Sequence, residues 1–149
     1  MTSVNIATMP DPDQRLFFLL QRAAHQVRTI ADRRLLDAAG ITTAQLGALY
    51  AVQDEPGITQ QRLARALGLR ESAVTGLVAR LTAAGLVVRQ AHPSEHRAVV
   101  VRLAEAGHAA LRSAQPEVER FNAELRALLG ADGFTGTAAA LHHLAHWQR

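Results

Sequence analysis

The 149-residue sequence predicts a mainly α-helical protein with a winged helix-turn-helix core, a two-stranded β-wing, and flanking N- and C-terminal helices. Apolar residues recur at helical spacing over most of the chain, and two short helices separated by a glycine turn lie near its middle. After them, "VVRQA" and "AVVVRL" are β-branched runs on either side of a polar turn, which is typical of a hairpin. Apolar residues make up 48% of the chain, so we expect a globular core.

Two helices are expected before the core. The first runs over residues 13–39 and stops at Gly40, after a flexible tail over residues 1–12. In "ITTAQLGALYAVQDEPG", Thr42 or Thr43 caps a short second helix that the Pro-Gly pair ends.

The core follows in the order helix, helix, hairpin. "ITQQRLARALGL" opens with Thr59 as a cap and breaks at Gly68, and "RESAVTGLVARLTAAG" forms the second helix of the pair. After the hairpin, helix resumes near Glu105, and Pro116 inside it predicts a kink or a break. "GADG" separates a last helix over residues 134–147.

The charge of the chain is concentrated in the core. The net charge is +3, but residues 58–103 hold seven Arg and two Glu, a net +5, which leaves −2 for the remainder. All 16 basic residues are Arg, the better bidentate partner for phosphates and guanine edges. A basic middle with acidic flanks predicts a surface for a polyanion.

A winged helix presents its second helix to the major groove of DNA, and its hairpin follows the backbone toward the minor groove. The small side chains of Gly76 and Ala79 would permit close approach of that helix. The residues expected to contact DNA are Gln60, Gln61, Arg70, Ser72, Thr75, Arg80, His96 and Arg97. Two alternatives stay open: the Arg residues form a solvated helix face, or Arg97 forms a salt bridge with Glu95 or another acid. His96 would also make DNA contact depend on pH.

The stretches "GITTAQLGALYAV", "LARALGLRESAVTGLVARLTAAGLVVR" and "HPSEHRAVVVRLAEAG" resemble the MarR family of bacterial transcriptional regulators over residues 40–107. The resemblance implies an N-terminal dimerisation helix (13–40), a DNA-binding lobe (41–104) and C-terminal dimerisation helices (105–149). It also implies a homodimer on a pseudo-palindromic operator in double-stranded DNA, released by a small anionic, often aromatic, ligand.

The chain departs from the family pattern at three positions. Glu95 stands where the family's wing has Asp, which lengthens an expected tether to a nearby Arg by one methylene. Ala104 replaces a Thr that caps the following helix, at a typical cost of about 1 kcal/mol. Gly76 stands where many relatives carry an Arg, so one DNA contact is expected to be missing.

Polar residues on the first two helices are candidates for the effector pocket that the resemblance implies. They are Gln21, His25 and Tyr50, and the alternative is that they are satisfied core or interface residues. Phe17, Phe18 and Trp147 are expected to anchor the dimer. His142 and His146 share a helix face as metal ligands would, but His near a helix C-terminus is also favoured electrostatically, and no metal or other cofactor is predicted.

No catalytic motif is present, so the chain is not expected to be an enzyme. The lack of Cys excludes disulfides and thiol chemistry. No apolar run approaches the ~20 residues that cross a bilayer, and no signal peptide is recognised, so a cytoplasmic protein without a membrane partner is expected. The alternative function is a winged-helix protein-interaction or effector-binding module with weak DNA affinity.

Overall fold

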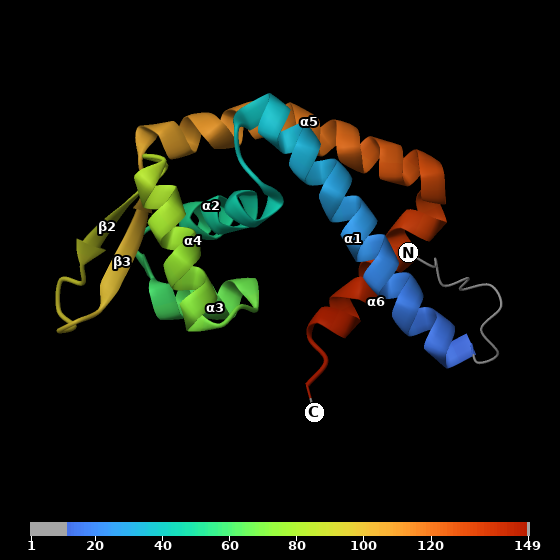
Figure 1. Cartoon of the computed structure of the whole chain (residues 1–149), viewed down its shortest axis with the longest axis horizontal. Coiled ribbons are helices and arrows are strands. Elements are labelled where there is room, and N and C mark those ends of the chain that lie inside the picture. The colour runs from blue at the N-terminus through green and yellow to red at the C-terminus, as the bar shows by residue number, and fades with distance from the viewer. Residues whose placement is uncertain (1–11, 149) are drawn as a thin grey trace, which may run out of the picture.

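The computed structural model describes residues 12–148, with side chains from residue 15 onward. The tail predicted for residues 1–12 therefore lies almost entirely outside the described residues. The elements, shown in Figure 1, are α1 (Pro12–Ala39), α2 (Thr43–Asp54), β1 (Ile58–Thr59), α3 (Gln60–Leu67), α4 (Glu71–Ala83), β2 (Val87–Ala91), β3 (Val99–Leu103), α5 (Glu105–Leu129) and α6 (Ala131–Ala145).

The predicted helix boundaries of the core are confirmed by their caps. The Thr42 hydroxyl accepts from the Gln45 backbone N–H at 3.2 Å, and the Gln45 side chain accepts from the Thr42 N–H at 2.9 Å, which is a capping box. Thr59 caps α3 in the same way through the Arg62 N–H. Gly40 and Gly68 end α1 and α3 at φ 68° and 64°, in the left-handed region that glycine tolerates best.

The predicted wing is confirmed and belongs to a three-stranded antiparallel sheet in the order β1-β3-β2. Val87 on β2 pairs with Leu103 on β3, and the register runs to Ala91 opposite Val99. β1 was missed by the sequence analysis because it is two residues long and contains the Thr that caps α3. Its Ile58 pairs with Val101, which ties the helix pair to the wing.

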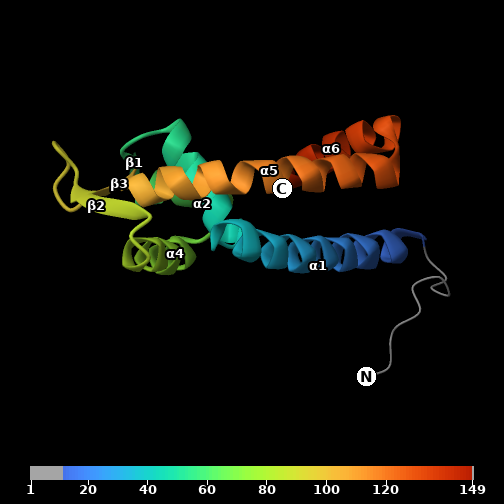
Figure 2. The same ribbon diagram turned by 90° about the horizontal axis from the view of Figure 1, so that it is seen from above.

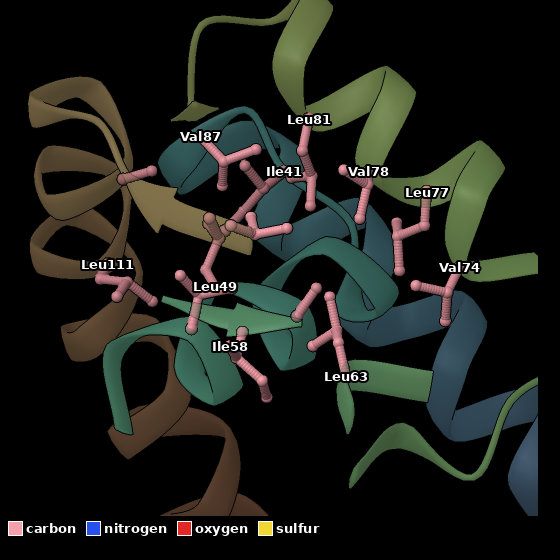
Figure 3. Close-up of a cluster of buried hydrophobic side chains, with 14 of the residues drawn as sticks. Ile41, Leu49, Ile58, Leu63, Val74, Leu77, Val78, Leu81, Val87 and Leu111 are labelled. Atoms are coloured by element: carbon pink, nitrogen blue, oxygen red, sulfur yellow. The ribbon is translucent and has the colours of Figure 1, made fainter. Parts of the chain in front are cut away.

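One apolar core lies between α2, α3, α4 and the sheet, and Leu35 of α1 and Leu111 of α5 also contribute to it (Figure 3). The side chains that point into it from these elements include Leu49, Leu63, Val78, Leu81 and Val87, all almost fully buried. Because these residues come from helices and strands alike, the core fixes α4 relative to the wing. The outer face of α4 is therefore held in a defined position beside the hairpin.

α1, α5 and α6 extend from this lobe as long helices. α1 meets α5 near the C-terminal end of α1 and diverges from it toward the N-terminus (Figure 1). α6 folds back on α5, and Figure 2 shows it on the side of α5 away from α1. Across the described residues no single helix is long and apolar enough to cross a membrane; α1 and α2 satisfy those criteria only together, with a bend of 66° between them.

Two predictions for the C-terminal region are corrected. α5 continues through Pro116, so the predicted break is wrong: proline removes one N–H, while Leu111, Ala114 and Glu117 on both sides of it stay buried within one helix. The last helix begins at Ala131, three residues before the prediction, and Gly130 alone separates it from α5. The sequence predicts that "GADG" separates the two helices, but Asp132 lies in the first turn of α6, where a carboxylate is favourable.

Candidate nucleic-acid interface

α4 presents a polar face opposite its buried one. Ser72, Thr75 and Arg80 are exposed on that face, and Arg70 is exposed at the N-cap position just before the helix. The Thr75 hydroxyl donates to the Glu71 carbonyl at 2.9 Å, which leaves its oxygen free to accept. These positions offer donors and acceptors of the kind that read phosphates and base edges.

The backbone of α4 is open to close approach at Gly76. A Cβ built there would meet only the Arg80 guanidinium, at 3.5 Å, which is ordinary van der Waals contact. A side chain larger than glycine would stand between the helix and a bound molecule. At the centre of the exposed face of α4, Arg80 is therefore the side chain that lies nearest to Gly76.

The starts of α3 and α4 converge with the wing around a polar cavity of about 350 Å³. Gln60, Gln61 and Arg97 line it, so three of the predicted DNA-binding residues come together from two elements. Glu71 and Glu95 line the same space. The Gln60 Oε1 is buried and has no hydrogen-bond partner among the described residues, so one acceptor in this region is unsatisfied.

Some basic residues of the core form ion pairs within the described chain, and others do not. Arg62 is paired with Glu55, its Nε lying 2.8 Å from Oε1. Within residues 12–148, the recorded ion pairs include none with Arg70, Arg80 or Arg97. The guanidinium donors of those three residues therefore remain available to an external anion.

The wing turn holds Arg97 in an unusual backbone conformation. Arg97 has φ 72° and is the one described non-glycine residue with positive φ. No ion pair joins it to Glu95, so neither the alternative pairing of Arg97 nor the expected Glu95 tether is found in the described chain. His96 is exposed beside it, in a shallow cavity of about 370 Å³ that Arg89 and His92 also line.

The predicted effector residues are not gathered around one cavity. The Tyr50 hydroxyl donates to the Gln115 side chain at 3.1 Å and lines a cavity of about 230 Å³ between α2 and α5, with His108 and Arg112. Gln21 and His25 are exposed on α1, and they line none of the cavities described here. Their assignment to an effector pocket remains a prediction.

A different cavity, of about 150 Å³, lies where α1, α2 and α5 meet. Leu35, Leu46 and Phe121 give it an apolar lining, and Arg34 and Glu117 supply charge. The sequence analysis missed it because Arg34 and Glu117 are 83 positions apart and only the fold brings them together.

The charges beside this cavity form a connected network. The Arg34 guanidinium donates to Glu117 and, at 2.7 Å and 3.0 Å, to both carboxylate oxygens of Glu124. Arg120 donates to Glu117 from the other side at 2.6 Å. Hydrogen bonds from Arg120, and then from Arg34, lower the pKa of Glu117, and those from Arg34 lower the pKa of Glu124. The hydrogen bonds to Glu124, and to a smaller extent those to Glu117, raise the pKa of Arg34. Arg34, Glu117 and Glu124 therefore all stay charged at neutral pH.

The histidines of α6 interact mainly with one another. The rings of His142 and His146 lie 4.3 Å apart between centroids, and the His146 Nδ1 donates to the His142 carbonyl at 2.8 Å. Across the part of the chain that the structure describes, no group of three or more His, Cys, Asp or Glu side chains could hold a metal ion.

The sequence of this chain is similar to those of known proteins. A model of the MarR family matches residues 39–98. The transcriptional repressor NicR of Pseudomonas putida is 29% identical over 106 residues, which are 71% of this chain and 66% of that protein. Across three curated relatives the match spans between 57% and 66% of their own length.

Solved structures extend the match over the whole fold. The regulator PcaV of Streptomyces coelicolor, in complex with its natural ligand, superimposes with a TM-score of 0.76 at 26% identity, covering 97% of each chain. The repressor CouR, bound to a 23-mer DNA duplex, superimposes with a TM-score of 0.83 at 26% identity, covering 93% of this chain and 98% of that one. Since these regulators are not enzymes, the expectation of a non-enzymatic protein is confirmed, and the chain is similar in sequence and fold to the MarR family of winged-helix transcriptional regulators.

Proposed function

We propose that the chain binds a pseudo-palindromic operator in double-stranded DNA as a homodimer, acts as a repressor in the cytoplasm, and is released by a small anionic or aromatic ligand. The observation that carries the proposal is the polar, open face of α4 beside a wing whose Arg97 is free of ion pairs. NicR and CouR are repressors, and CouR was solved on DNA, which supports the same activity here.

In the proposed complex α4 enters the major groove. Ser72 and Thr75 contact bases or phosphates, and Arg80, two turns from Ser72, reaches the backbone. Arg97 follows the hairpin to the minor groove, where a narrow A·T segment concentrates negative potential. Gln60, Gln61, Arg70 and His96 complete the proposed contacts.

The proposed dimer is supported by the exposed apolar side chains of the terminal helices. Large apolar side chains without a covering element mark interaction surfaces in water-soluble domains. On α1 and in and after α6 they are Leu16, Phe17, Phe18, Leu19, Val27, Ile30, Leu36, Leu141, Leu144 and Trp147. A second copy would cover both helices and place two α4 helices about one DNA turn, ~34 Å, apart.

For the effector, the cavity at the junction of α1, α2 and α5 is the better candidate. Phe121 gives it an aromatic wall, over which the Arg34 guanidinium lies 5.2 Å from the ring centroid. A ligand carboxylate would compete with Glu117 and Glu124 for the Arg34 donors. The cavity touches both the terminal helices and the α2 side of the lobe. A ligand that prefers one spacing of the two DNA-binding lobes would shift the population away from the DNA-binding state. Gln21, His25 and Tyr50 are the second set of candidate effector-binding residues.

The test is a titration of the purified protein against the DNA upstream of its own gene and against an unrelated duplex, at several salt concentrations. We expect tighter binding to the upstream DNA and a steep loss of affinity with salt. A response that does not change with salt, or no binding to any duplex, would overturn the proposal.

The alternative is a protein-interaction or effector-binding module with weak DNA affinity. Glu71 and Glu95 favour it, because two carboxylates line the same cavity as Arg97 and would repel phosphates. Replacing Arg80 and Arg97 together by Ala separates the two functions. Unchanged DNA binding would support the module.

A further inference from the structure

The side chain of His92 organises the turn of the wing. His92 ends the β2 side of the hairpin, and its backbone N–H donates to the Ala98 carbonyl at 2.9 Å. Its ring Nδ1 accepts from the Ser94 backbone N–H at 3.1 Å and from the Glu95 backbone N–H at 2.9 Å. Pro93 has no N–H, so these are the first two donors that follow His92, and both point at one nitrogen.

These contacts fix the charge state of the ring. A backbone N–H can only donate, so the Nδ1 that receives two of them must carry a lone pair. The ring is therefore neutral, with its proton on Nε2. A proton on Nδ1 would oppose both backbone N–H groups, and the acceptor nearest to it would be the Ser94 hydroxyl oxygen at 3.4 Å, so the two backbone hydrogen bonds of the turn would be lost.

The same turn holds Arg97. The Ala98 N–H donates to the Glu95 carbonyl at 3.3 Å, which closes the turn around residues 96 and 97. A side chain other than glycine persists at positive φ only where its surroundings hold it there. Without the His92 contacts, Arg97 would return to negative φ and its guanidinium would leave its place beside Gln60 and Gln61.

We propose that His92 is a positioning residue for Arg97, and that protonation of its Nδ1 opens the wing turn and weakens DNA binding. The inference rests on the proposed DNA-binding function and adds its regulation by pH. Imidazoles change charge between pH 5 and 8, which is the range in which the effect is expected.

Other charged groups lie near His92, and their effects on DNA binding must be distinguished from the effect of His92. Those that line the same cavity are Arg89, Glu95, His96 and Arg97, and Glu71 of α4 lines the adjoining one. Of these, His96 is the only other imidazole, the side chain that changes charge most readily near neutral pH. Protonated His96 adds a positive charge and strengthens DNA binding, whereas protonated His92 weakens it, so the two effects have opposite signs.

The first experiment uses the free full-length protein and needs no DNA. At pH 7.5, nitrogen-detected NMR of the imidazoles is expected to show an unprotonated Nδ1 on His92. Between pH 7.5 and 5.5 the backbone amide signals of Ser94, Glu95 and Arg97 should move with the His92 ring. A proton on Nδ1 at pH 7.5, or amide signals that do not follow the ring, would overturn the proposal.

The second experiment measures DNA affinity in proteins that all carry His96→Gln. His92→Asn keeps an acceptor for the following N–H groups but cannot gain a proton. It should bind as tightly as the His96→Gln reference at pH 7.5 and lose little affinity at pH 5.5, where the reference weakens by about fivefold. His92→Ala should be weak at both values.

Each outcome of the second experiment decides the proposal. Equal pH profiles for the reference and His92→Asn, or tight binding by His92→Ala at pH 7.5, would overturn the role of His92. If the reference binds no DNA at any pH, the proposed function fails, and the NMR measurement still decides the state of the turn.

Discussion

The lobe formed by α2, α3, α4 and the sheet differs from the terminal helices in where its apolar residues lie. In the lobe, Leu49, Leu63 and Leu81 are completely buried within one chain. On α6, fully described over its length, no residue is buried, and on α1 only Leu35 is. Both regions are rich in Ala and Leu, so composition alone does not distinguish them. The core of the lobe is closed within one chain, with Leu35 of α1 and Leu111 of α5 completing it, whereas α6 and most of the described part of α1 carry apolar side chains that a single chain leaves uncovered.

The largest effect is expected from a charge placed on the terminal helices. Phe18 on α1 is 38% exposed and Val88 on β2 is 42% exposed, so the two are matched within one chain. Phe18→Asp should convert the proposed dimer to a monomer and destabilise the fold by about 3 kcal/mol per protomer, because Phe18 would be buried in that dimer. Val88→Asp should leave the assembly unchanged.

Sedimentation and thermal unfolding measure both variants. If Phe18→Asp and Val88→Asp show the same sedimentation and the same thermal unfolding, the terminal helices do not differ from the lobe in their need for a partner. The apolar face of α1 would then need no partner copy.

The next largest effect concerns the close contact at the start of α5. A Cβ at Gly107 would lie 2.2 Å from the Leu86 carbonyl oxygen, whereas one at Gly47 would lie 3.8 Å from a Leu67 methyl group. Gly107→Ala should therefore destabilise the protein by about 2 to 3 kcal/mol. Gly47→Ala should stabilise it by up to ~1 kcal/mol through helix propensity. Urea unfolding of both variants checks the contrast, and a tolerated Gly107→Ala would show that α5 can move away from the lobe.

A smaller effect on stability is expected from the charged network of Arg34, Glu117 and Glu124, which joins α1 to α5. The pKa values of Glu117 and Glu124 are lowered in the folded protein, so folding favours their charged forms. Their contribution to stability is complete at neutral pH, above the ordinary Glu value near 4.3, and is lost as the pH falls through the lowered values. The melting temperature of Arg34→Gln should lie below that of the wild type at pH 7, and the gap should narrow below about pH 4. A gap that stays constant with pH would exclude this electrostatic origin.

The smallest effect is expected at the N-cap of α5. Ala104 occupies that position with extended backbone and no side-chain cap, while Thr42 caps α2. Ala104→Thr should stabilise the protein by about 1 kcal/mol, and Thr42→Ala should destabilise it by a similar amount. Chemical denaturation measures the pair, and a neutral Ala104→Thr would mean that the cap is replaced by other contacts.

The sequence predicted the lobe well because its signals are local. Thr42, Thr59 and Gly68 mark helix ends through contacts within a few residues. The alternation of Val99, Val101 and Leu103 with Val100 and Arg102 marks a strand. α4 and the wing follow from the same kind of pattern. β1 escaped because two residues carry no periodicity, and the continuity of α5 escaped because burial on both sides of Pro116 depends on packing.

The candidate sites were predicted less completely because they depend on contacts between distant residues. Arg34 meets Glu117 and Glu124 only through the packing of α1 on α5, and nothing in either local sequence indicates it. His92 lies inside the stretch "HPSE", but its role depends on the direction of two backbone N–H groups, which a sequence does not show. Gln21 and His25 were grouped with Tyr50 by helix position, and the fold separates them.

The most direct test of the proposed function is the salt dependence of operator binding in a matched pair of double variants. Arg80→Ala/Arg97→Ala removes two proposed phosphate-facing charges per protomer, while Arg33→Ala/Arg112→Ala removes two exposed charges from α1 and α5. For a dimer, the first variant should make the slope of log K against log salt shallower by roughly 3 to 4, and the second should leave it unchanged. Equal slopes in the two variants would contradict DNA binding through α4 and the wing.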